Sequence, residues 1–91
     1  MFGRWGYFAR GHLFACFPLR VQERDLWVWL PLGQQARALA QVGVRPHRRF
    51  ARRGWVEIDL ESERDVERAL RWLRHAHAAA LARPAAEDDV E

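Results

Sequence analysis

The chain has 91 residues, of which 49% are hydrophobic and five are tryptophan, so it carries enough apolar material for one folded core, which excludes a disordered protein. Its single cysteine, Cys16, excludes an internal disulfide, and this cysteine usage predicts a cytoplasmic protein. The longest uncharged stretch, residues 26–36, is too short to cross a bilayer, so we expect no membrane partner.

The charge is unevenly distributed along the chain. All 15 basic residues are arginine, which indicates the codon bias of a GC-rich genome and lowers the weight of arginine abundance as a functional signal. Four of the 12 acidic residues lie in residues 84–91, which we predict to be a disordered acidic tail. The predicted single domain, residues 1–83, carries 15 arginines and eight acidic residues, a net charge of +7.

The first third of the chain predicts three antiparallel strands. Residues 5–10 and 12–19 are rich in aromatic side chains, and Gly11 between them supplies the backbone freedom of a hairpin turn. A third strand over residues 25–30 ends at Pro31. These segments predict a three-stranded meander.

The remaining elements follow from periodicity. Residues 33–41 have helical spacing and lead to Gly43, while Pro46 makes residues 44–50 an extended segment or loop. Residues 56–60 alternate between apolar and acidic, as in a strand with one buried face. Ser62 and Asp65 resemble a capping box, and the following apolar residues recur every three or four positions until Pro84.

The predicted fold class is α+β, with an antiparallel sheet of four or five strands and two helices on one face. The order is strand–strand–strand–helix–(strand)–strand–helix. The first three strands are apolar on both faces, and two helices cover only one side of such a sheet. The second face therefore needs a cover, which can be another subunit, a ligand or more of the chain.

Short motifs resemble known bacterial families. The chain opens like the TfoX N-terminal domain, with Met1-Phe2-Gly3, Tyr7-Phe8, Gly11 and Leu13-Phe14-Ala15. The run Arg53-Gly54-Trp55-Val56-Glu57-Ile58-Asp59-Leu60 and the helix after it are similar to MmcQ/YjbR-type domains. A Gly-Trp-Val strand after Pro46-His47 also resembles the small bacterial "luciferase domain" proteins.

The resemblance covers residues 1–82 and implies an antiparallel sheet packed on helices, with a regulatory role or a DNA-binding mode. It implies no catalytic residue. TfoX-type domains usually carry a helix before the Met-Phe-Gly motif, and without such a helix a sheet face is left open. We therefore expect a small non-catalytic cytoplasmic regulatory or interaction domain that forms a homodimer, with the interface at Phe14, Trp27 and Trp29.

A basic cluster is the strongest candidate site. Five arginines lie within nine residues, namely Arg45, Arg48, Arg49, Arg52 and Arg53. Arginine forks suit phosphates, and the flanking Phe50 and Trp55 suit stacking on bases, which predicts a nucleic-acid-binding module. The alternative is that these arginines pair with the acidic run between Glu57 and Asp65.

The other candidate residues favour structural roles. Trp27 and Trp29 fit packing better than a ligand platform, Cys16 fits a buried thiol, and His75 and His77 point in different directions on a helix. We therefore predict no catalytic residue, no metal site and no cofactor. A deep pocket lined by tryptophan with a histidine or cysteine at its base would favour the remaining alternative, a small-ligand binder or enzyme.

Overall fold

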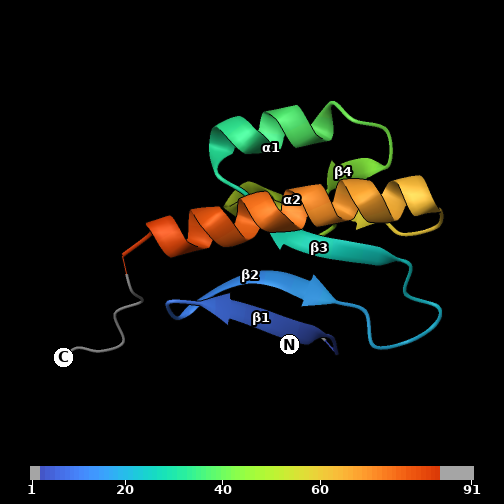
Figure 1. Ribbon diagram of the computed structural model, residues 1–91, viewed down its shortest axis with the longest axis horizontal. Helices are drawn as coiled ribbons and strands as arrows, with labels where there is room; N and C mark the ends of the chain where they lie inside the picture. Colours follow the sequence, from blue (N-terminus) through green and yellow to red (C-terminus); the bar gives the residue numbers. More distant parts are fainter. Residues whose placement is uncertain (1–2, 85–91) are drawn as a thin grey trace.

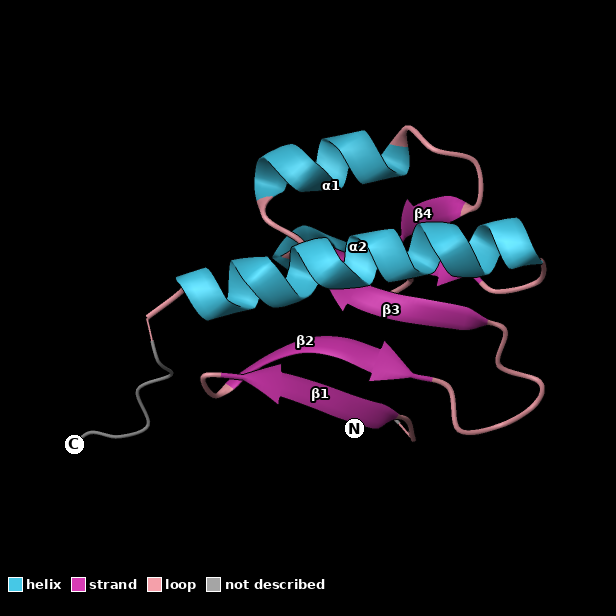
Figure 2. Ribbon diagram, viewed as in Figure 1, coloured by secondary structure: helices cyan, strands magenta, loops and turns pink. Residues whose placement is uncertain are grey.

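The computed structural model describes residues 3–84, so residues 85–91 of the predicted acidic tail lie outside the described residues. A five-stranded antiparallel sheet carries two helices on one face (Figures 1 and 2). The elements in chain order are β1 (Trp5–Ala9), β2 (His12–Phe17), β3 (Asp25–Trp29), α1 (Leu32–Leu39), β4 (Val44–Pro46), a short 3-10 helix η1 (Ala51–Arg53), β5 (Trp55–Asp59) and α2 (Glu63–Ala82). The predicted α+β class and element order are confirmed. Neither described helix is long and apolar enough to span a membrane.

The spatial strand order is β1-β2-β3-β5-β4, so the last two strands are exchanged relative to the chain. The β1–β2 hairpin closes at Arg10 and Gly11, whose φ angles of 54° and 84° are both positive, as a two-residue hairpin turn requires. The predicted meander of three strands is thus present. The segment after α1, for which either an extended segment or a loop was expected, forms the edge strand β4 and then a loop.

The core lies between the sheet and the helices. Val28, Leu30, Val56 and Ile58 on the middle strands are almost fully buried, together with the most buried face of α2: Ala69, Trp72, Ala76 and Ala80. The Trp72 indole N–H donates to the side-chain oxygen of Gln41 at 3.1 Å, which ties the end of the α1 region to α2. Small alanines let α2 approach the sheet closely, and Trp72 fills the space next to α1.

The predicted helix start at Ser62 is confirmed. Its hydroxyl accepts a hydrogen bond from the Asp65 N–H at 3.1 Å, and the Asp65 carboxylate accepts one from the Glu61 N–H at 2.9 Å. The Asp65 carboxylate thus bonds the backbone N–H of Glu61, the residue before the cap, whereas in a capping box it would bond the N–H of Ser62 itself. Gly43 lies three residues beyond the α1 cap at Ala40, in the turn into β4, with a φ of +85°.

Gly54 connects the loop after β4 to β5. Its φ is +96°, and a Cβ atom there would lie 2.9 Å from the carbonyl oxygen of Leu30. Its own carbonyl accepts a hydrogen bond from the Leu30 N–H at 3.0 Å. Only glycine fits this close approach, which holds the loop of residues 47–54 against the end of β3.

We call the side of the sheet without helices the outer face. Its centre is covered by the chain itself, because Arg4 and the loop of residues 47–54 pack on Trp27 and leave that side chain only 7% exposed. Of the three covers that the sequence allowed, more of the chain is the one found there.

Candidate functional site

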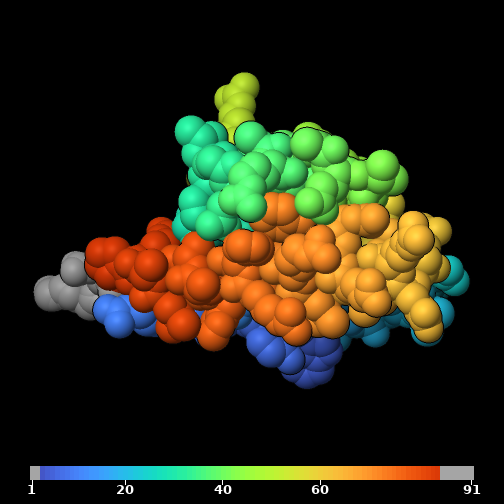
Figure 3. All heavy atoms as spheres, turned by 45° about the horizontal axis from the view of Figure 1, so that its top comes forward, coloured from blue at the N-terminus to red at the C-terminus, as the bar shows by residue number. Residues whose placement is uncertain are grey.

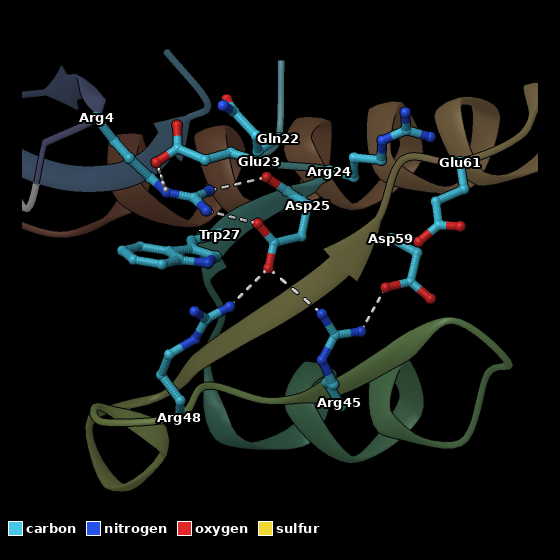
Figure 4. A pocket seen from close by; sticks show the side chains of 10 residues that line it. All are labelled: Arg4, Gln22, Glu23, Arg24, Asp25, Trp27, Arg45, Arg48, Asp59 and Glu61. Carbon is cyan, nitrogen blue, oxygen red and sulfur yellow. Dashed lines mark hydrogen bonds and ion pairs between the residues drawn. The ribbon is translucent and has the colours of Figure 1, made fainter. Parts of the chain in front are cut away.

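Six charged side chains converge on the outer face of β3, β4 and β5, and Figure 4 draws all of them except Glu57. We call them the charge network: Arg4, Asp25, Arg45, Arg48, Glu57 and Asp59. The Asp25 carboxylate lies at its centre and accepts hydrogen bonds from Arg4 at 2.6 Å, Arg48 at 2.9 Å and Arg45 at 3.3 Å. Three cations of the network thus meet its three anions, and Arg4 also lies 3.9 Å from the Glu23 carboxylate.

Glu57 is the second buried anion of the network. The sheet register places it beside Trp27 on β3 and Arg45 on β4. Its carboxylate accepts hydrogen bonds from Arg45 Nε at 3.0 Å, and from Arg48 Nε at 2.7 Å and backbone N–H at 2.9 Å. Burial alone raises the pKa of Glu57, but the hydrogen bonds from Arg48 and the charges of Arg48 and Arg45 outweigh it, so the pKa lies below its ordinary range.

We expect Glu57→Gln to lower the free energy of unfolding by about 1.5–3 kcal/mol at neutral pH, the contribution of hydrogen bonds to a charged group. A carboxylate with a lowered folded-state pKa stabilises the protein above its unfolded pKa, and this contribution disappears as pH falls through the folded value. The difference between the two proteins should therefore be full above about pH 5 and shrink below about pH 4. Urea unfolding at several pH values measures it, and a difference independent of pH would contradict the role of the Glu57 charge.

Trp27 lies between the cations of the network. The Arg4 guanidinium lies 3.9 Å and that of Arg48 5.4 Å from a ring centroid of Trp27, and the His47 ring contacts it edge-on at 4.3 Å. Trp27 therefore joins the chain start to the loop after β4.

The three predicted interface residues lie in different environments. Trp27 and Phe14 are 7% and 6% exposed, so a second copy would find little surface on either. Phe14 contacts the His77 ring of α2 at 5.2 Å, and half-buried Trp29 carries the Arg83 guanidinium at 4.6 Å. The dimer interface at these residues stays a prediction.

His47 organises the loop of residues 47–54, which we call the arginine loop. Its Nδ1 accepts hydrogen bonds from the backbone N–H groups of Arg49 and Phe50, both at 3.0 Å. Burial lowers the pKa of His47, so the ring is neutral and can accept these bonds. His47 is thus an uncharged anchor of this loop.

The five predicted arginines divide into two groups. Arg45 and Arg48 belong to the charge network, so for them the alternative of local pairing describes the structure. Arg49, Arg52 and Arg53 are exposed, and within residues 3–84 they make no ion pair. The arginine loop therefore carries three positive charges in excess of the balanced network.

A groove of about 350 Å³ lies beside the arginine loop. We call it the aromatic groove, and its walls are mostly apolar: Leu13, Cys16, Trp27, His47, Phe50, Arg53 and Trp55. A second hollow shares Trp27, His47 and Phe50 and continues to Arg48 and Arg49. The outer face thus has a continuous depression that runs past the excess arginines.

The groove contains no activated acid, base or nucleophile. Burial raises the pKa of the Cys16 thiol, so it stays protonated, and the predicted burial of Cys16 is confirmed. His47 has its Nδ1 occupied by backbone donors. Across residues 3–84 no group of histidine, cysteine, aspartate and glutamate side chains is arranged to hold a metal ion.

The sequence did not identify Arg4 and Asp25 as partners. They are 21 residues apart, and only the folded sheet brings them together. The one available signal was Asp25 itself, an acidic residue two positions before Trp27 and therefore on the same face of an apolar strand.

Comparisons with known proteins identified no match for this chain. No protein-family model matches it, and searches of curated proteins and of solved structures found no similar protein. The likeness to TfoX-type and YjbR-type domains therefore rests on the quoted motifs alone and stays a prediction.

Proposed function

We propose that this domain is a non-catalytic binding module whose outer face binds single-stranded nucleic acid. The observation that carries the proposal is the aromatic groove beside Arg49, Arg52 and Arg53, which make no ion pair within the described residues. These three arginines are not needed to pair the buried acids Asp25 and Glu57, since Arg4, Arg45 and Arg48 already do so.

The chemistry of the face suits such a ligand. Every nucleobase has a π-face that stacks on aromatic side chains, and Trp55 and Phe50 are half-buried walls of the groove. Arginine forks match the geometry of phosphate oxygens. The second hollow shares three walls with the groove and extends to Arg49. This gives room for a strand longer than one nucleotide. The charge network below the groove holds the arginine loop in place.

The wider proposal is a cytoplasmic regulatory domain of TfoX N-terminal or YjbR-like type. The single buried cysteine supports a reducing compartment. The motif resemblance and the antiparallel sheet packed on helices, which the resemblance implies, support the family. The protonated thiol of Cys16 and the occupied ring nitrogen of His47 support a non-enzymatic role.

Fluorescence anisotropy with a labelled single-stranded oligonucleotide tests the proposal. Three phosphate contacts predict a slope of log K against log salt of about −2, from about −0.7 per contact. Replacing Arg49, Arg52 and Arg53 together by glutamine should abolish most of this slope. Trp55→Ala should weaken binding by about 1–3 kcal/mol at every salt concentration, because it removes stacking but no charge.

A matched control removes the same charge elsewhere. Arg10, Arg64 and Arg71 are exposed residues away from the groove, and their replacement by glutamine should leave the affinity nearly unchanged. Absence of binding at low salt would contradict the proposal. So would equal losses in the two triple variants, since binding would then follow net charge alone.

A small planar anion is the second candidate ligand. The groove has Trp27, Trp55, His47 and Cys16 in its lining, the residue types that the sequence named for a ligand pocket. Its volume of about 350 Å³ lies within the range of small-molecule pockets. Calorimetric titration separates the two: a mononucleotide that binds as tightly as a longer oligonucleotide would favour the small ligand.

A further inference from the structure

The helix side of the sheet is incompletely covered. α1 packs on β4 and β5, and α2 packs mainly on β2, β3 and β5, while the edge strand β1 has no helix directly over it (Figure 1). Trp5 and Tyr7 of β1 consequently remain 63% and 53% exposed. Figure 3 shows this first strand, in dark blue, emerging beside α2 on the surface.

α2 presents an exposed apolar flank towards the same side. Its exposed apolar members are Val66, Leu70 and Leu81, at 43%, 45% and 47%. The half-buried Leu73, which also packs against the core, and the exposed His77 lie between them. The flank borders the buried alanine face that packs on the sheet, and Val66, Leu70 and Leu81 are the members that stay exposed.

A hollow of about 320 Å³ joins the flank of α2 to the hairpin. Its lining comes from both sides: Tyr7, Phe14, Phe17, Leu73, Arg74 and His77. The Tyr7 and Phe17 rings lie 4.7 Å apart at its floor. The exposed flank of α2, this hollow and the exposed side chains of β1 form one continuous strip, which we call the α2–β1 surface.

We propose that the α2–β1 surface binds a second copy of this chain, with the two α2 helices antiparallel. Positions 66, 70, 73, 77 and 81 are spaced by four, three, four and four, which is close to the alternation of three and four with which two helices pack against each other. Leu70 of one copy would then lie against Leu73 and the hollow of the other. The partner is a second copy because the border of the strip is complementary to itself.

That complementarity comes from Glu67 and Arg74, which flank the apolar residues on their solvent side. Their sequence positions place the acidic residue towards the start of α2 and the basic residue towards its end. A two-fold axis near Leu70 and Leu73 brings Glu67 of each copy opposite Arg74 of the other, twice per dimer. A parallel arrangement would place like charges together, so the charges select the antiparallel one.

This dimer leaves both outer faces exposed, so it is independent of the proposed nucleic-acid binding. It also differs from an interface at Trp27, which lies on the outer face, although Phe14 of the predicted interface lines the hollow of the α2–β1 surface. The two interfaces therefore make different predictions for variants of α2.

Sedimentation equilibrium over about 1 μM to 1 mM measures the dimer constant. We expect the wild-type protein to dimerise within this range and Leu70→Glu to raise the dimer Kd by at least about tenfold. Leu32→Glu is the matched control, because Leu32 is 81% exposed on α1 and lies off the strip. Circular dichroism checks that both variants are folded. A wild-type monomer throughout, or a dimer unchanged by Leu70→Glu, would overturn the proposal.

A charge exchange tests the antiparallel register. Glu67→Arg alone and Arg74→Glu alone should each weaken the dimer, because each places like charges opposite one another across the interface. The double variant E67R/R74E restores two complementary pairs and should return the Kd to near the wild-type value. Failure of the double variant to recover would overturn this arrangement of the helices.

Discussion

Replacing Asp25 with asparagine should lower the free energy of unfolding by about 3–5 kcal/mol, the cost of removing one partner from a buried ion pair. Asp25 is the central anion of the charge network, and its side chain and that of Arg4 are only 7% and 4% exposed. Without the carboxylate, the Arg4 charge stays buried and cannot turn towards water. The loss is a large part of the total stability of a small domain.

Urea unfolding followed by tryptophan fluorescence measures this effect. Asp59→Asn is the matched control, since it removes a carboxylate from the same network at a site with 31% of its side chain exposed. That change should cost less than about 1 kcal/mol, as for a surface ion pair. Similar losses for the two variants would show that burial of the Arg4 charge does not govern the cost.

Trp72→Ala should destabilise the protein by about 3–5 kcal/mol, the range for a large aromatic side chain removed from a core. Trp72 is one of the largest fully buried side chains and packs between α2, the sheet and the end of α1. The substitution leaves a cavity and also leaves the side-chain oxygen of Gln41 without its indole donor. Both losses act on the contact that holds α1 against α2.

Val42→Ala provides the comparison for Trp72. Val42 lies next to Gln41 but is 85% exposed, so its truncation should change stability by no more than about 0.5 kcal/mol. Hydrogen exchange of α1 amides would locate the damage in Trp72→Ala. Retained stability in that variant would mean that the core collapses around the vacancy.

The elements that the sequence predicted depend on local interactions. A glycine in the turn defines the β1–β2 hairpin, alternation defines β5, and Ser62 with the apolar repeat defines α2. Each of these patterns spans about the length of one helix or strand, so it can be recognised from the sequence alone. The fold class followed from these segments because few architectures accommodate their order.

The candidate site depends on distant residues and was only partly predictable. The sequence shows the five arginines as one cluster. Which of them are paired with buried acids, Arg45 and Arg48, depends on how the strands pair in the sheet. β4 pairs with β5, the next strand in the chain, which places Arg45 beside Glu57, and β5 in turn pairs with β3, which carries Asp25. No periodicity in the sequence encodes that neighbour relation.

The sequence indicated a sheet face that needs a cover, but it did not indicate which part of the sheet stays exposed. The apolar residues of β3 on the outer face are covered by Arg4 and the arginine loop, which the sequence could not place there. The exposed apolar strip lies instead along β1 and α2 on the helix side. The difference arises because α2 packs mainly on β2, β3 and β5 and covers the edge strand β1 only in part.

The shared carboxylate of Asp25 makes the fourth residue of the chain a structural neighbour of the arginine loop. Arg4 and Arg48 bond to opposite oxygens of one side chain and contact the same indole ring. Arg4 therefore lies close in the fold to Trp27, a wall of the groove, despite the separation of 44 positions between Arg4 and Arg48. Affinity measurements should therefore compare protein with and without a purification tag ahead of Arg4.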